Sequence, residues 1–114
     1  MPYDVNLNFV FWCPTKIVFG ENTALDVAIE VENLKCKRAF IITDRDLAKY
    51  TDIPERIKKV LGNLCVGVFS DVEPDSGIYI VNQGAMLGKE LEADCLVSVG
   101  GGSAIDTAKG MAIL

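Results

Sequence analysis

The chain has 114 residues, of which 50% are hydrophobic and 24% are charged, and this composition is typical of one globular domain. Its net charge of −5 argues against binding to nucleic acid, which requires clustered basic residues. No apolar run approaches the ~18 residues of a membrane helix. The polar residues 1–8 also lack the charged-then-apolar order of a signal peptide. We therefore expect a cytoplasmic protein with neither nucleic acid nor a membrane as a partner.

The cysteines are spread along the chain without a C-x-x-C pair, which favours reduced thiols that serve as small core residues. The sequence contains no histidine, and the cysteine spacing does not indicate a zinc site. We therefore predict no metal ligands. The four cysteines are Cys13, Cys36, Cys65 and Cys95.

Hydrophobic periodicity in the first part of the chain predicts strands and then a helix. Residues 5–11 alternate in polarity like a strand, and Lys16 to Phe19 forms a second extended piece after Pro14, so an N-terminal β-hairpin is expected. Thr23 is a candidate cap for a helix that runs to about residue 34. Residues 39–43 form a short continuous apolar run, which is typical of a strand buried on both faces of a parallel sheet.

The remaining elements alternate between helix and strand. A helix is expected between residues 51–52 and Gly62, with Pro54 near its first turn. The pattern then predicts a strand, a loop, a helix, a strand, a glycine turn and a last helix, over residues 65–69, 71–77, 78–92, 95–99, 100–102 and 103–114. This order predicts a single α/β domain over residues 1–114, with a parallel sheet that carries helices on both faces.

Polar residues and glycines follow three of the predicted strands directly. Asp44 follows the first buried strand, residues 71–77 follow the second, and residues 100–103 follow the third. Ligands of open α/β sheets bind at the carboxyl ends of the strands, so we expect these segments to form a ligand-binding edge. The three carboxylates of the middle segment, at Asp71, Glu73 and Asp75, are expected to lie in a solvated loop.

The glycine turn carries the clearest chemical signal. Glycines allow a ligand to approach the backbone, and the free N–H groups of the following helix favour an anion such as phosphate. Ser103 could donate its hydroxyl to a phosphate oxygen, and Lys109 could add positive charge. A structural interpretation is also open, because Ser103 and Asp106 have the spacing of a capping box. The segment is neither a P-loop nor G-x-G-x-x-G.

This segment resembles the fingerprint of iron-containing alcohol dehydrogenases of the lactaldehyde, propanediol and butanol group. The matching pattern is Gly-Gly-Gly-Ser-x-x-Asp-x-x-Lys after a Val-Ser-Val strand. Residues 14–20 are similar to the family's opening hairpin, residues 40–44 to its second nucleotide strand, and residues 71–75 to its Val-x-Pro-Asn-Pro loop. The resemblance covers about residues 9–114 and implies a Rossmann-like fold of the dehydroquinate synthase-like N-terminal type.

The resemblance implies that NAD lies across the strand edge. Asp44 matches the residue that hydrogen-bonds the adenosine ribose, although a helix cap is its alternative role. Residues 101–103 match the pyrophosphate cradle, whereas Asp75 stands where the family usually has Asn. The implied cofactor-binding residues are Asp44, Asp75, Gly101, Gly102, Ser103, Asp106 and Lys109.

Two features of the family have no counterpart in this chain. The family's iron is held by one Asp and three His in a helical C-terminal domain, and its second nucleotide loop is rich in Thr; the chain has no His. The resemblance therefore implies a truncated chain, inactive alone, from an enzyme that uses Fe²⁺ to transfer hydride between an alcohol or aldehyde and NAD. Alternative hypotheses are a stand-alone non-catalytic nucleotide-binding module and a fragment of a glycerol dehydrogenase-like relative.

The first predicted strand also bears on assembly. Residues 5–11 are expected at the rim of the sheet, where unpaired backbone groups can pair with a second copy of the same strand. Such a contact is self-complementary and closes at two subunits. We therefore expect a homodimer formed through the N-terminal strand.

Overall fold

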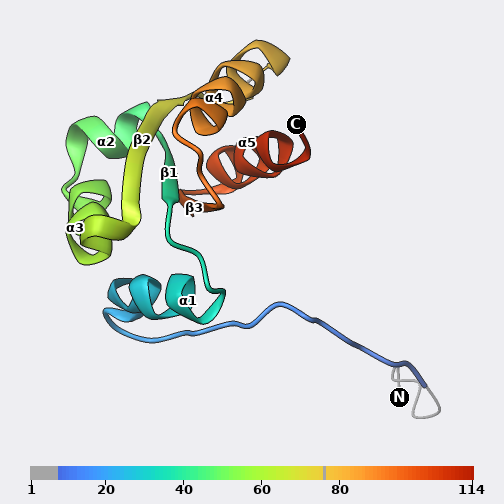
Figure 1. Ribbon diagram of the computed structural model, residues 1–114. Helices are drawn as coiled ribbons and strands as arrows, with labels where there is room; N and C mark the ends of the chain where they lie inside the picture. Colours follow the sequence, from blue (N-terminus) through green and yellow to red (C-terminus); the bar gives the residue numbers. More distant parts are fainter. Residues whose placement is uncertain (1–7, 76) are drawn as a thin grey trace.

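The computed structural model describes residues 8–75 and 77–114, and these form a parallel sheet with helices on both faces (Figure 1). Strand β1 (Ala39–Asp44) lies in the centre, between β2 (Cys65–Val72) and β3 (Cys95–Val99). Both pairings are parallel. The predicted α/β class is therefore confirmed for the described part of the chain.

The central strand forms the core because it is covered on every side. All five side chains of residues 39–43 are buried. Phe40 and Ile42 pack against α4 (Ile78–Glu90) and α5 (Gly102–Ile113) on one face of the sheet. Ala39 and Ile41 pack against α1 (Val27–Asn33) and α3 (Ile53–Leu61) on the other face. The continuous apolar run thus reflects burial of both faces, as its pattern predicted.

Helices α4 and α5 pack closely because glycines lie at their contact. A Cβ atom on Gly84 of α4 would come within 1.9 Å of the Met111 side chain of α5. A Cβ atom on Gly110 of α5 would come within 3.0 Å of Val81. The absence of a side chain at these two positions allows the close approach of α4 and α5.

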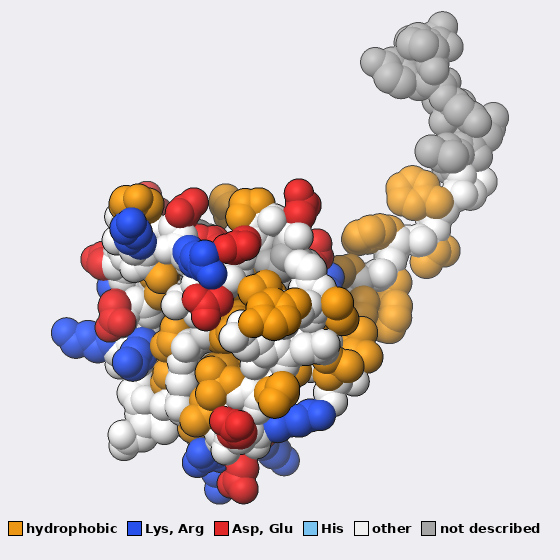
Figure 2. Space-filling model, turned by 90° about the horizontal axis from the view of Figure 1, so that it is seen from above, with side chains coloured by type: hydrophobic (Ala, Val, Ile, Leu, Met, Phe, Trp, Pro, Cys, Tyr) orange, Lys and Arg blue, Asp and Glu red, His pale blue; other side chains and the backbone are white. Residues whose placement is uncertain are grey.

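The predicted N-terminal hairpin is not shown by the structure. Residues 8–19, the amino-terminal arm, form no strand and run away from the sheet, while residues 1–7 lie outside the described part (Figure 1). Figure 2 shows hydrophobic side chains gathered along this arm, and Phe11, Trp12 and Phe19 are more than four-fifths exposed. An ion pair of 2.6 Å joins Lys16 of the arm to Glu30 of α1. An isolated hairpin is marginally stable in water, and the described chain offers this segment no partner strand.

The helix predicted from Thr23 begins differently from the expectation. A 3-10 turn, η1 (Thr23–Asp26), precedes α1, and Asn22 caps that turn in the left-handed conformation with φ 60°. Thr23 is therefore not the cap; its hydroxyl instead donates to the carbonyl of Gly20 at 3.1 Å. The predicted helix is confirmed, but its first turn is tighter and its cap is Asn22.

Two further elements differ from the sequence prediction. A short helix, α2 (Arg45–Tyr50), follows β1 directly and was not predicted. Strand β2 continues to Val72, so it includes the first residues of the predicted loop. A 3-10 turn, η2 (Gly62–Leu64), lies just before β2. Both differences lie at the carboxyl ends of strands, where the candidate site is found.

The other predicted elements agree closely with the structure. Helix α3 begins at Ile53 with Pro54 in its first turn and ends before Gly62. Strand β3 occupies its predicted range, and α4 begins at the predicted residue but ends two residues earlier, at Glu90. No helix among the described residues is long and apolar enough to cross a membrane.

Candidate functional site

The carboxyl ends of the three strands meet at one edge, and a pocket of about 840 Å³ lies there. Helix α2, the end of β2 and the start of α5 line the pocket. Four of the predicted cofactor-binding residues line it together, although they come from segments far apart in the sequence: Asp44, Gly101, Gly102 and Ser103. Parallel pairing of β1 with β3 brings them together.

The two carboxylate oxygens of Asp44 have different environments. It is the N-cap of α2, where Oδ1 accepts a 2.6 Å hydrogen bond from the backbone N–H of Leu47. Oδ2 has no hydrogen-bond partner among the described residues and lies beside Gly100. The cap role considered from the sequence is therefore present, and it leaves one acceptor oxygen available at the pocket.

The local structure requires glycine at only one of the three positions of the turn. Gly100 has φ +144°, and a Cβ atom there would lie 3.1 Å from Asp44 Oδ2 and 3.2 Å from the Ala104 Cβ. Both the conformation and the crowding exclude a larger residue. Gly101 and Gly102 have neither constraint, because their φ angles are not positive and a Cβ atom would meet nothing within 4 Å. The space beside them is open pocket.

Helix α5 presents unpaired donors at the pocket. Its N-cap is Gly101, and the first helical hydrogen bond runs from Ile105 N–H to the Gly101 carbonyl at 3.1 Å. The N–H groups of residues 102–104 precede that bond, so the helix supplies no carbonyl for them. Ser103 lies inside the first turn and makes no cap, so the capping-box alternative is wrong. Its hydroxyl has no partner in the described part of the chain.

The other predicted site residues lie beside this pocket or apart from it. Asp75 and Asp106 line a smaller hollow of about 410 Å³ that shares Ser103 with the main pocket. Asp75 has φ 56°, a left-handed conformation that Asn and Asp adopt more readily than most residues. Lys109 instead lines a different hollow, between α4, α5 and β3, and so the structure does not bring it to the pocket edge.

Arg45 is a residue of the site that the sequence prediction missed. Its guanidinium contacts Glu73 at 2.5 Å and Asp71 at 3.7 Å, so α2 is tied to the end of β2. All three residues, Asp71, Glu73 and Asp75, are exposed, so the expected solvation of these carboxylates is confirmed, although Asp71 belongs to β2 and two of them contact Arg45. Arg45 is the one cationic side chain among the described residues that line the main pocket, beside the acidic Asp44, Asp46 and Glu73. The sequence signal that could have identified Arg45 was its position next to Asp44, at the end of a predicted strand.

Residues 14–114 match the profile of the iron-containing alcohol dehydrogenase family. The chain belongs to this family. The chain is 32% identical over 106 residues to alcohol dehydrogenase 4 of Schizosaccharomyces pombe, a match that covers 91% of this chain and 25% of the relative. The resemblance stated from the glycine turn is therefore confirmed.

Two solved structures show the same fold as this chain. Maleylacetate reductase from Agrobacterium tumefaciens aligns with a TM-score of 0.83 at 30% identity, over 94% of this chain and 30% of that one. NADH-dependent butanol dehydrogenase A from Thermotoga maritima aligns with a TM-score of 0.82 at 28% identity, over 92% of this chain and 27% of that one. The chain thus spans between a quarter and a third of the length of these relatives.

Proposed function

We propose that this chain is a single NAD-binding domain and serves as the nucleotide-binding part of an iron-dependent alcohol dehydrogenase. In that enzyme, hydride would pass between an alcohol or aldehyde and NAD. One observation carries the proposal: Gly101 and Gly102 adjoin open pocket although neither packing nor backbone conformation requires glycine there. A bound pyrophosphate would account for both glycines, because it needs close access to the backbone.

The first turn of α5 provides the groups that a pyrophosphate requires. The N–H groups of residues 102–104 lack helical partners, and the helix dipole adds partial positive charge at the same end. Ser103 supplies a hydroxyl donor. In this proposal these donors bind the phosphate oxygens of NAD. Asp75 and Asp106 border the neighbouring hollow, and Lys109 lies outside the pocket.

Asp44 supports the choice of NAD over NADP. Its free Oδ2 can accept a hydrogen bond from a ribose hydroxyl, while Oδ1 remains engaged by α2. A 2′-phosphate would meet the carboxylates of Asp44 and Asp46 on the same pocket wall. At a separation of ~4 Å, such repulsion costs on the order of 1–4 kcal/mol. The family relative from Thermotoga maritima is NADH-dependent by name.

The residues of this chain do not fit the iron site that the family implies. That site needs three histidines, and the chain has none. The proposal therefore assigns the iron ligands and the substrate pocket to parts of the full-length enzyme outside this chain. When bound, NAD supplies the hydride acceptor; the residues described above bind and orient its ADP-ribose half.

Calorimetric titration of the 114-residue chain with NAD, NADP and ADP-ribose tests the proposal. We expect NAD and ADP-ribose to bind with similar affinity, because the described contacts involve only the shared half of the molecule, and NADP to bind more weakly. Equal binding of NADP, or no binding of ADP-ribose, would contradict the assigned contacts. An assay of alcohol oxidation with added Fe²⁺ tests whether this chain is catalytic by itself. Binding without turnover is expected from a nucleotide-binding part or a stand-alone module, whereas turnover would require a catalytic site in this chain.

A further inference from the structure

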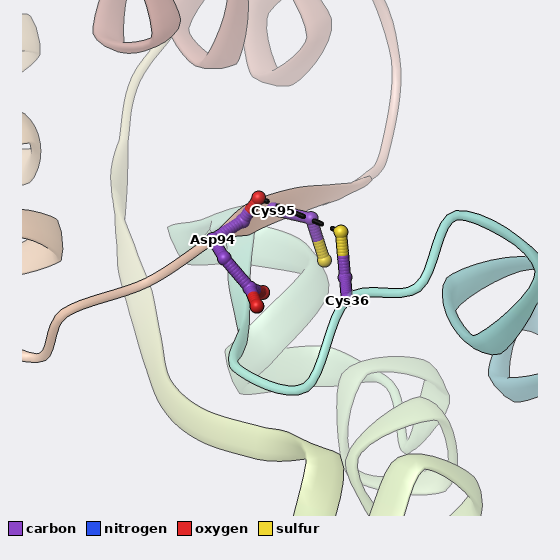
Figure 3. A group of neighbouring side chains, drawn as sticks. All are labelled: Cys36, Asp94 and Cys95. Atoms are coloured by element: carbon purple, nitrogen blue, oxygen red, sulfur yellow. Dashed lines mark hydrogen bonds between the residues drawn. The ribbon is translucent and has the colours of Figure 1, made fainter.

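A cluster of three potential metal ligands lies at the opposite end of the sheet from the nucleotide pocket. Cys36 precedes β1, Asp94 immediately precedes β3, and Cys95 is the first residue of β3, so all three lie at the amino ends of the strands. Figure 3 shows the three side chains together. One ligand atom from each residue lies within 4.8 Å of the other two. We refer to these residues as the thiol cluster.

The carboxylate of Asp94 is held in place by the backbone of the segment just before β1. Its Oδ2 accepts a hydrogen bond from the N–H of Lys37, and its Oδ1 accepts one from the N–H of Arg38, both at 2.9 Å. These two bonds lower the pKa of the Asp94 carboxyl. Each oxygen keeps a second lone pair, and carboxylates that bind metals are commonly oriented by outer hydrogen bonds of this kind.

The two thiols are partly shielded, but they remain reachable from solvent. Cys36 and Cys95 are half-buried, whereas Asp94 is exposed. The Cys36 thiol already lies 3.6 Å from the backbone carbonyl of Asp94. Burial, together with the neighbouring Cys36, raises the pKa of Cys95 to about 12. A cation must therefore displace the Cys95 proton, as thiol ligands of metals generally require.

We propose that the thiol cluster binds one thiophilic divalent cation of the Zn²⁺ type, with Cys36, Asp94 and Cys95 as ligands and water in the fourth position. Bonds of ~2.0–2.3 Å in a tetrahedral site place the ligand atoms about 3.3–3.8 Å apart. The observed ligand atoms lie within 4.8 Å of one another, so the three side chains would move together when the ion binds. Two sulfurs and one carboxylate oxygen are ligands that zinc accepts.

The bound ion would join the segment before β1 to the start of β3, and its role would be structural. The donors come from parts of the chain 58 residues apart, so the ion would close a long loop. Because such a site exists only in the folded chain, binding of the ion stabilises the fold. The site is separate from the nucleotide pocket, and the proposal does not depend on NAD binding.

The test is a titration of the reduced 114-residue chain with Zn²⁺ in competition with a chromophoric chelator. We expect one ion per chain, and Zn²⁺ should protect Cys36, but not Cys13, from alkylation mapped by mass spectrometry. Cys36→Ser and Cys95→Ser should abolish saturable binding. Cys13→Ser is the matched control and should bind one ion like the unchanged chain, because Cys13 lies exposed on the amino-terminal arm.

Circular dichroism shows whether each variant folds, and the alkylation map of the unchanged chain tests the proposal even if a variant does not. Absence of saturable binding, or unchanged binding by folded Cys36→Ser, would overturn the site. One ion per two chains that is lost in Cys13→Ser would also overturn it, since the ligands would then come from two copies.

Discussion

We expect replacement of Gly102 by alanine to weaken nucleotide binding without destabilising the fold, whereas the same replacement at Gly100 should destabilise the fold. Gly102 is the first residue of α5, and a Cβ atom there meets nothing within 4 Å. Gly100, two residues earlier, has φ +144° and is crowded by Asp44 and Ala104. Gly102→Ala and Gly100→Ala are thus matched changes with opposite expected effects on stability.

The magnitudes follow from the local structure. Alanine at Gly102 restricts the unfolded chain without strain and should stabilise the fold by ~0.4–1 kcal/mol. For a domain of this size, that corresponds to a rise in melting temperature of about 2–5 °C. Alanine at Gly100 should destabilise the fold by ~1–3 kcal/mol, because it is strained at that φ. The new methyl group at residue 102 occupies the pocket, and loss of one hydrogen bond to a charged phosphate costs ~1.5–3 kcal/mol.

Thermal unfolding and NAD calorimetry on the two variants and the unchanged chain measure both effects. The expected binding loss for Gly102→Ala is about tenfold to a hundredfold in Kd, since each ~1.4 kcal/mol changes Kd tenfold. A Gly102→Ala variant that is more stable and binds NAD as tightly as the unchanged chain would refute the reasoning. A destabilised Gly102→Ala variant would also refute it, because the methyl group would then have met other atoms instead of open space.

Three further predictions concern the pocket and the arm. Asp44→Asn keeps an oxygen for the α2 cap but removes the negative charge, so the ratio of the NADP dissociation constant to the NAD dissociation constant should fall. An unchanged ratio in competition titrations would argue against a ribose contact. Asp75→Asn keeps a residue suited to φ 56° and removes a negative charge beside the proposed phosphate position, so NAD should bind about 2–5-fold more tightly in the same titrations. Weaker binding would contradict this. Light scattering should show a dimer that is lost when residues 1–19 are deleted, because the amino-terminal arm exposes the apolar side chains of Phe11, Trp12 and Phe19. A deletion variant that stays dimeric would place the interface elsewhere.

The sequence was most informative where burial dictates composition. The mainly apolar runs at residues 39–43 and 95–99 predicted β1 and β3 closely, because a strand that packs between helices has few polar positions; β1 is almost fully buried and β3 is half-buried. Helix α2 was missed because six residues are too few to display a helical period, although its cap, Asp44, was noted. The hairpin was predicted from alternation alone, and alternation does not supply a partner strand.

The candidate site was likewise predicted only in part from the sequence. The glycine turn and Asp44 were found because each follows a strand end, and parallel topology then brings the ends together. Local spacing could not reveal the ion pairs of Arg45, and it could not place Lys109 in a different hollow. The thiol cluster escaped for the same reason, since its cysteines become neighbours only through the pairing of β1 with β3.

The order of the strands also has a consequence for how the chain reaches this structure. Strand β1 is made first but lies in the centre, and its hydrogen-bonded contact with β3 joins Thr43 to Val99, 56 residues later. During synthesis β1 can pair with β2 early, but one of its edges waits until α4 and β3 have been added. Contacts of such large sequence separation slow folding and leave an apolar edge open to other chains in the meantime. Amide hydrogen exchange should therefore be slowest in β1, and a pulse-labelling experiment should show its β2-facing amides protected before its β3-facing ones.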